Sequence, residues 1–291
     1  MRIQDKSVLD SRMLWLLRME STWYDSIPMD NSTIYARLLA SQRMILWQVL
    51  LPVVPSRRHL STSCLWSLSE LKTNYPIEIL GVNNNSKDRT EDVYQRLGLP
   101  YYNETKQSPG YARQCGLQHA KGKYHFFIDA DTFYPSCYVN KMMEKLTKPG
   151  VSCVGTFWSF YPDEQHSAFS LLCFELIRDT FLWVQHFKRP ELNIRGMTFA
   201  FNADYARQCT IRTDIRRGED GSLALELKRY GRITFLYDRK ARPVTGYGTL
   251  NEDSLLHSLW NRIRVQMKGI FRIFYKTDHY EDTEDNLMHR P

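Results

Sequence analysis

The sequence has no apolar run long enough to cross a membrane. No stretch of its 291 residues approaches the roughly 20 apolar residues that a spanning helix needs. The beginning of the chain lacks the basic start, apolar middle and small-residue cleavage site of a signal peptide. The six cysteines form no C-x-x-C pair, so neither a zinc-binding spacing nor a disulfide framework is visible. We therefore expect reduced thiols and a cytoplasmic location.

Repeats, low-complexity segments and a strong charge of one sign are also missing. Charged residues make up 24% of the chain and hydrophobic residues 43%, which is ordinary globular usage. This composition excludes a disordered chain, a collagen-like chain and a simple coiled coil. The net charge of +7 is modest and no nucleic-acid-binding motif appears, so we expect no nucleic-acid partner.

The chain divides into three parts. Residues 1–43 show no clear pattern, residues 44–250 alternate predicted strands with helices, and residues 251–291 combine an amphipathic helix with an acidic tail. The alternation predicts an α/β fold with a mostly parallel, doubly wound sheet flanked by helices. The expected strands are Ile45–Leu51 (ended by Pro52 and Pro55), Ile77–Val82, Tyr101–Asn103, Tyr124–Ile128, Val151–Phe160, Met197–Asn202 and Ile233–Tyr237. The expected helices are Leu60–Leu71, Thr90–Leu97, Tyr111–Ala120 with Gly122 as a cap, Ser167–Lys188 and Ser222–Tyr230 closed by Gly231.

A D-x-D motif is the sharpest chemical signal. Asp129-Ala130-Asp131 follows an apolar predicted strand directly, so both carboxylates lie at a strand end. Mg²⁺ typically takes one or two carboxylates and completes its shell with water and substrate phosphate. An isolated D-x-D is more often a solvated turn, because Asp favours turns. The apolar strand before this motif favours a ligand site instead, since ligands bind beyond the carboxyl ends of such strands.

Three further polar groups admit two interpretations each. Asn83 and Asn84 follow another predicted strand and could bond a base or ribose. Alternatively this turn only begins the next helix, with Ser86, Asp88 or Thr90 as its cap. Arg113, near a helix start, could clamp a diphosphate or could be solvated. Glu219 and Asp220 begin a helix, where one carboxylate could act as a general base. An acidic first turn alone more often just stabilises its helix.

A basic amphipathic helix is predicted over residues 255–276. Nine apolar residues recur there at helical spacing, and five Lys or Arg residues supply charge. This pattern suits a helix lying on anionic lipid and equally suits a terminal helix packed on the core.

Taken in order, these motifs resemble the family 2 glycosyltransferases of the GT-A fold. The matching runs are Val82–Thr90, Gly110–Leu117, Ala120–Asp131, Gly196–Phe201 and Gly218–Asp220. Each run alone is weak, but their order and spacing make the likeness specific. The likeness extends over residues 45–245.

The resemblance implies a metal-assisted enzyme that transfers a sugar with inversion, in glycan or cell-envelope polysaccharide synthesis. The partners it implies are a nucleoside-diphosphate sugar and a glycan or lipid-linked acceptor. Peripheral contact with the inner face of the plasma membrane is an expectation from the basic amphipathic helix. The roles that the resemblance implies are the general base for Asp220, with Glu219 beside it, and Mg²⁺ or Mn²⁺ binding for Asp131. Nucleotide-sugar binding is implied for Asn83, Asn84, Arg113, Asp129 and Gly196.

Two departures from the family pattern keep alternatives open. The carboxylate that usually follows the first strand is absent, because Pro52-Val53-Val54 leads into Pro55-Ser56-Arg57. Asn83 and Asn84 stand where carboxylates are usual. A non-catalytic member of the fold that binds nucleotide-sugar or glycan is therefore the main alternative. A peripheral membrane scaffold rests only on the terminal helix, and a nucleotidyltransferase is disfavoured because Pro52–Leu60 contains no glycine.

Overall fold

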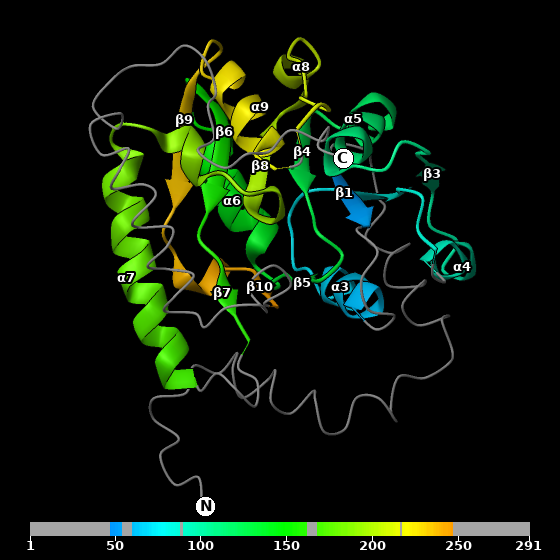
Figure 1. Cartoon of the computed structure of the whole chain (residues 1–291), viewed down its shortest axis with the longest axis horizontal. Helices are drawn as coiled ribbons and strands as arrows, with labels where there is room; N and C mark the ends of the chain where they lie inside the picture. Colours follow the sequence, from blue (N-terminus) through cyan, green and yellow to red (C-terminus); the bar gives the residue numbers. More distant parts are fainter. Residues whose placement is uncertain (1–46, 54–59, 88–89, 162–167, 216, 247–291) are drawn as a thin grey trace, which may run out of the picture.

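The computed structural model describes residues 47–53, 60–87, 90–161, 168–215 and 217–246 (Figure 1). The predicted N-terminal segment 1–43 and the predicted amphipathic helix 255–276 lie outside the described residues.

A seven-stranded sheet in the order β3-β2-β1-β4-β8-β6-β9 forms the centre of the molecule. Its strands are β1 (Trp47–Val53), β2 (Glu78–Asn83), β3 (Tyr101–Asn103), β4 (Tyr124–Phe127), β6 (Val151–Thr156), β8 (Phe199–Asn202) and β9 (Arg232–Leu236). All neighbouring strands pair in parallel except β8, which is antiparallel to both β4 and β6. The predicted α/β class with a mostly parallel sheet is confirmed.

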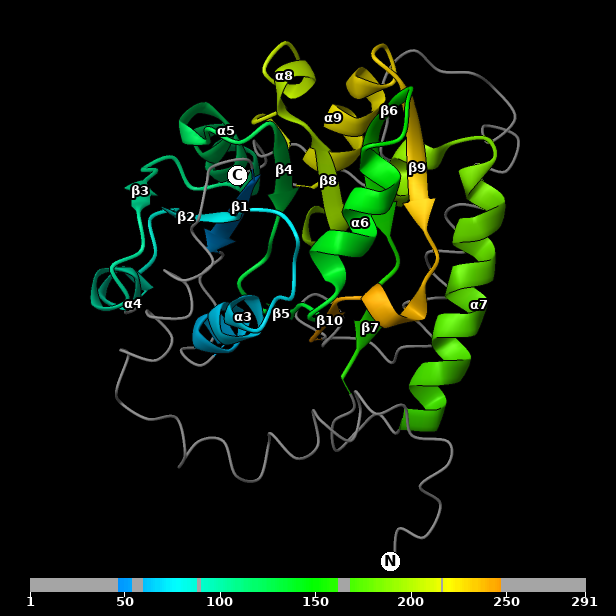
Figure 2. The ribbon, with the colours of Figure 1, turned by 180° about the vertical axis from the view of Figure 1, so that it is seen from behind.

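Helices cover both faces of this sheet (Figures 1 and 2). One face carries α3 (Leu60–Ser69), α4 (Thr90–Arg96) and α6 (Tyr138–Leu146). The other carries α5 (Pro109–His119), α7 (Ala168–His186), α8 (Ala203–Ala206) and α9 (Glu219–Leu227). The sequence analysis did not predict α6. In the described part of the chain, no helix is both long and apolar enough to span a membrane.

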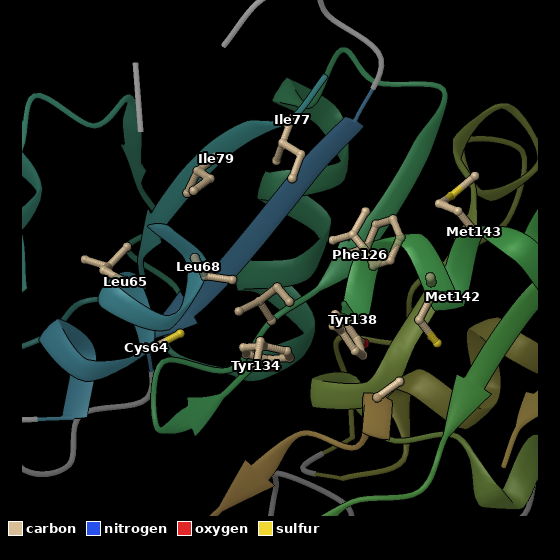
Figure 3. Close-up of a cluster of buried hydrophobic side chains, with 14 of the residues drawn as sticks. Cys64, Leu65, Leu68, Ile77, Ile79, Phe126, Tyr134, Tyr138, Met142 and Met143 are labelled. Atoms are coloured by element: carbon tan, nitrogen blue, oxygen red, sulfur yellow. The ribbon is translucent and has the colours of Figure 1, made fainter. Parts of the chain in front are cut away.

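Alternating side chains along each strand divide the core into two layers. Ile79 and Phe126 pack with α3 and α6, whereas the adjacent Leu80 and Phe127 pack on the opposite face. Figure 3 shows the first layer, which contains Leu65 and Leu68 of α3 together with aromatic and methionine side chains that include Tyr138 and Met142. Burial on both faces accounts for the apolar strand sequences, which is typical of parallel sheets.

A small second sheet lies at one end of the large one. It consists of β5 (Thr132–Phe133), β10 (Val244–Thr245) and β7 (Ser159–Phe160), in that order. The predicted strand Val151–Phe160 is therefore wrong as one element, because it divides into β6 and β7 in different sheets. An apolar run does not reveal which sheet each half will join.

Four predicted element ends need correction. The first strand continues through Pro52, which pairs with Val82 of β2. Proline is tolerated at position 52 because β4 pairs with β1 only as far as Leu50. No strand on the β4 side of β1 therefore needs the N–H that Pro52 lacks. The predicted cap at Gly122 is wrong, since α5 ends on Ala120 in an extended conformation. The helix before Gly231 ends on Lys228, and the strand expected to begin at Met197 begins at Phe199.

Candidate active site

The D-x-D motif forms the turn that follows β4. Asp129 and Asp131 are both half-buried, with 32% of the Asp129 side chain exposed. The Asp131 carboxylate accepts a hydrogen bond from the Thr132 hydroxyl at 3.3 Å. The Thr245 hydroxyl donates to the Asp131 main-chain carbonyl at 3.5 Å. The small sheet thus holds Asp131 at the carboxyl end of β4, where ligands of α/β sheets bind.

Arg113 reaches this turn from α5. The helix starts at Pro109, and the Ser108 hydroxyl caps it by accepting from the Tyr111 N–H at 3.2 Å. Arg113 lies one turn further on and is 5% exposed. Its guanidinium pairs with Asp129 at 3.5 Å and stacks near the Phe127 ring. The solvated interpretation of Arg113 is therefore wrong.

The acidic start of α9 meets the same arginine. Gly218 precedes the helix with a φ of 91°, a left-handed conformation that glycine adopts without strain. The turn that Gly218 permits brings Glu219 and Asp220 onto the Arg113 guanidinium, which forms ion pairs with both. We call Arg113, Asp129, Glu219 and Asp220 the site cluster.

Gly196 lies against this cluster. It begins a short 3-10 turn, Gly196–Thr198, that leads into β8. A Cβ atom at position 196 would collide with the Arg113 guanidinium and would lie 3.0 Å from the Asp220 carboxylate. Only glycine leaves room for the arginine to reach Asp220, which is a structural reason for this residue beside its predicted role in donor binding.

Tyr134 links the D-x-D turn to the Gly196 segment through hydrogen bonds. This role was not predicted from the sequence. The Asp129 N–H donates to the Tyr134 hydroxyl at 3.1 Å, and that hydroxyl donates to the Met197 carbonyl at 3.1 Å. The side chain is buried beneath the D-x-D turn. An isolated tyrosine gives no signal of such a link, because its partners are main-chain groups and one of them, Met197, lies 63 residues away in sequence.

Asn83 and Asn84 are buried at the end of β2 and have protein partners. Asn83 donates to Asn103 at 2.9 Å and accepts from the Ser86 N–H at 3.1 Å. The Asn84 amide donates to the carbonyls of Glu104 at 3.3 Å and Lys106 at 2.7 Å. Both side chains therefore stabilise the loop after β3. Since the two Asn84 amide hydrogens are engaged, its side-chain oxygen is the atom that a ligand could address.

The site cluster carries more negative than positive charge. One buried guanidinium faces three carboxylates, a formal charge of −2 if all are ionised. Burial raises the pKa of Asp220 to about 8, although Arg113 opposes the rise. Loss of surrounding water also raises the pKa values of Asp129 and Asp131. Burial alone would lower the pKa of Arg113, but the three carboxylates raise it above its ordinary value.

This charge excess suits a divalent cation. Within the described ranges, no three His, Cys, Asp or Glu side chains gather closely enough to hold a metal unaided. A magnesium-type site needs only one or two carboxylates and takes other oxygens from substrate phosphate and water. Asp131 fits such a site because it is two residues from Asp129 and forms no ion pair with any described residue.

The predicted site residues thus fall into two groups. Arg113, Asp129, Gly196, Glu219 and Asp220 come together, with Asp131 two residues from Asp129. Asn83 and Asn84 lie on β2, two strands from β4 in the same sheet. The parallel strands β2 and β4 end at the same edge, so both groups border one side of the sheet.

Comparison with known proteins gives one family match. Residues 58–207, which include Asn83 to Asp131 and Gly196, match the sequence family "Glycosyl transferase family 2". No curated protein matches the sequence.

Several solved structures share the fold at low sequence identity. A mannosyltransferase from Pyrobaculum calidifontis, PcManGT, in complex with GDP-Man and Mn²⁺, is 17% identical with a TM-score of 0.53, covering 83% of this chain and 72% of that one. Glucosyl-3-phosphoglycerate synthase from Mycobacterium tuberculosis, with Mn²⁺, UDP and phosphoglyceric acid, is 17% identical with a TM-score of 0.52, covering 84% of both chains. S. aureus TarS 1–349 is 14% identical with a TM-score of 0.50. The matched region covers 77% of this chain and 65% of the TarS fragment.

Proposed function

The chain belongs to glycosyl transferase family 2, and from this premise we propose that it transfers a sugar from a nucleoside-diphosphate donor to an acceptor hydroxyl. The observation that carries the proposal is the meeting of Asp129, Glu219 and Asp220 on Arg113 beside the D-x-D turn. Acidic groups from two distant segments share one sheet edge there. Solved neighbours with the same fold contain UDP, UDP-GlcNAc or GDP-Man.

Asp220 is the proposed general base. Its ionised carboxylate takes the proton from the acceptor hydroxyl while the acceptor oxygen forms a bond to the anomeric carbon. The bond from that carbon to the diphosphate breaks on the opposite side, so the configuration inverts. Arg113 favours the ionised form of Asp220 against the burial that opposes it. Glu219, adjacent in sequence, shares the same guanidinium and fixes its orientation.

The nucleotide side of the site has three proposed roles. Asp131 holds Mg²⁺ or Mn²⁺, and the Asp129 carboxylate faces the ribose. When bound, a divalent cation supplies positive charge that stabilises the departing diphosphate. Asn83 and Asn84 contact the base and ribose through side-chain oxygens, and the Gly196 segment borders the donor sugar.

The acceptor is proposed to be a glycan or a lipid-linked saccharide, in glycan or cell-envelope polysaccharide synthesis. A lipid-linked acceptor would bring the protein to the inner face of the plasma membrane as a peripheral protein. A donor screen determines which sugar and which nucleotide base the protein uses.

A donor screen tests this proposal directly. UDP-, GDP- and other nucleoside-diphosphate sugars are supplied with Mg²⁺, with Mn²⁺ or with a chelator, and released nucleoside diphosphate is measured. Asp131→Asn should lower metal-dependent release by roughly two orders of magnitude or more, as loss of a key electrostatic group typically does. Asp204→Asn is the matched control, because that carboxylate is 63% exposed on α8. Equal release by the wild type and Asp131→Asn would contradict the assignment.

A non-catalytic binding protein of the same fold is the second candidate. The observation that favours it is the use of the Asn83 and Asn84 amides within the protein, where the family usually has carboxylates. Calorimetric titration of nucleoside diphosphates with and without Mn²⁺, beside the donor screen, separates the two. Binding without release of diphosphate from any donor would support the second candidate.

A further inference from the structure

One face of α7 exposes large apolar side chains to solvent. Its exposed fractions are Phe169 75%, Leu176 53%, Ile177 51%, Trp183 49%, Val184 56% and, just beyond the helix, Phe187 66%. Spacings of seven, eight, fourteen and fifteen residues place these side chains on one side of a helix. Figures 1 and 2 show α7 along one edge of the molecule, at the opposite edge from β3 and α4.

The opposite face of α7 buries charged side chains. Glu175 accepts from the Ser159 hydroxyl at 3.0 Å and from the Phe160 N–H at 3.1 Å. Arg178 donates to the Trp158 carbonyl and pairs with Asp179 at 2.8 Å. The same inner face also buries Leu171, Phe174 and Leu182. The helix is therefore apolar on both sides, and its outer apolar side chains are not needed to hold it on the sheet.

The charges on α7 do not fit a lipid surface. Helices that lie on anionic bilayers carry Lys and Arg beside the apolar face. Between Ala168 and His186 the only such residue is Arg178, which is 6% exposed and engaged with Trp158 and Asp179. Lys188, directly after Phe187, is exposed at one end of this face, but no exposed cation lies along α7 itself. Such a face is better suited to another protein segment than to an anionic bilayer.

The chain itself carries a segment of complementary character. Residues 255–276 have apolar residues at helical spacing, which are Leu255, Leu256, Leu259, Trp260, Ile263, Met267, Ile270, Phe271 and Phe274. The segment 255–276 has 22 residues, which is close to the 19 residues of α7. The basic residues that α7 lacks are present here, so one side would remain soluble after the other is covered.

The end of the described chain lies within reach of α7. The last strand, β10, pairs with β7 through Thr245 and Phe160. The Phe160 ring lies 6.0 Å from the ring of Phe174 in α7. Residues 247–254 can span roughly 27 Å when extended, which is enough to bring residue 255 onto the helix.

We propose that residues 255–276 of the same chain pack along the exposed apolar face of α7. The apolar side of the segment covers Phe169, Ile177 and Val184, and its arginines and lysines face solvent. The terminal segment is then an intramolecular cover. This inference does not depend on the proposed catalytic activity.

Cys173 provides the test because it is exposed on α7, between Phe169 and Leu176. The full-length protein is labelled with a maleimide, and labelling is followed by peptide mass spectrometry. The partly exposed Cys137 and Cys209 serve as internal references. The doubly substituted Leu259→Gln, Ile263→Gln protein should label Cys173 about tenfold faster than the wild type, because local opening exposes the thiol. The control Arg262→Gln, Arg264→Gln introduces the same residue type on the basic side and should label at the wild-type rate.

Other occupants give different results, each of which overturns the proposal. Slow labelling of Cys173 that becomes fast on dilution would identify a second copy of the chain. Fast labelling that slows only with phosphatidylglycerol vesicles would identify a membrane surface. Equally fast labelling in the wild type and the variant would show an uncovered face. Hydrogen exchange of peptides from 255–276 in the wild type is the second measurement, and exchange at the rate of an unstructured peptide contradicts the proposal even if the variant fails to fold.

Discussion

Two buried clusters of charged side chains in this protein differ in their ratio of positive to negative groups. The site cluster sets one arginine against three carboxylates. The buried α7 cluster of Glu175, Arg178, Asp179 and Arg242 sets two arginines against two carboxylates, and the half-exposed Arg239 also pairs with Glu175. All four side chains of the α7 cluster are largely buried. A balanced buried cluster satisfies itself, but one with excess negative charge is satisfied only by a proton or a cation. The imbalance distinguishes a site prepared for a ligand from a cluster that holds a helix in place.

The packing around the two clusters also differs. The α7 cluster uses main-chain groups of Trp158 and Phe160 and stacks Arg178 on the Trp158 ring at 4.4 Å. In the site cluster, Arg113 fills the space that Gly196 leaves, and Asp129 keeps about a third of its side chain exposed. Packing therefore closes the α7 cluster and leaves the site cluster open at Asp129.

Arg113→Met should have the largest effect. It leaves three carboxylates without their cation, so we expect a loss of about 3–5 kcal/mol in the free energy of unfolding near pH 8. Sugar transfer should fall with it by roughly 100-fold or more, since Asp220 loses the charge that favours its ionised form. Urea unfolding and the donor assay measure the two effects. The exposed Arg229→Met is the control and should change neither.

Arg178→Met tests the α7 cluster in the same way. Breaking this buried pair should cost about 3 kcal/mol of stability, while the methionine keeps contact with Trp158. Transfer per folded molecule should match the wild type, because no member of the site cluster loses a partner. If transfer fell while stability held, Arg178 would belong to the active site and the comparison would fail.

Asp220→Asn and Asp179→Asn should shift stability in opposite directions. Removing one of the surplus carboxylates should stabilise the protein by about 1 kcal/mol at pH 8, although transfer is lost. Asp179→Asn removes a needed charge from the balanced cluster and should destabilise it. Thermal unfolding of both variants beside the wild type gives the signs, and two shifts of the same sign would contradict the distinction.

The pH dependence follows from the raised pKa of Asp220. Its value of about 8 in the folded protein, against an ordinary 3.8, means that the folded state holds this proton more tightly. The contribution of Asp220 to stability is therefore complete below pH 4 and is lost as the pH rises toward 8. The stability advantage of Asp220→Asn should shrink as the pH is lowered across this window.

Ser108→Ala should have the smallest effect. The hydroxyl caps α5, the helix that carries Arg113, and losing such a cap costs about 1 kcal/mol. Because the ion pairs of the site cluster remain, transfer should change far less than in Arg113→Met. A loss of transfer as large as that of Arg113→Met would show that the cap, rather than the charge, positions the arginine.

Much of the fold was predictable because local patterns determine it. The continuous apolar runs of β2 and β4, which are buried on both faces, and the helical spacing in α3 are properties of contiguous residues. The divided strand Val151–Phe160 and the passage of β1 through Pro52 were not predictable, since each depends on where a partner strand ends. The helix α6 was missed although its apolar residues have helical spacing.

The amino-acid order by itself determined which groups stand at strand and helix ends. Asp129 and Asp131 follow an apolar strand, and Glu219 and Asp220 begin a helix, whatever the rest of the chain does. Only the tertiary structure decided that these ends meet on Arg113, that Tyr134 joins the D-x-D turn to the Gly196 segment, and that α7 faces its charges inward. The physical reason is the distance along the sequence over which each effect acts. Propensity and periodicity act over a few residues, whereas ion pairing and desolvation depend on side chains that lie about 100 residues apart in sequence.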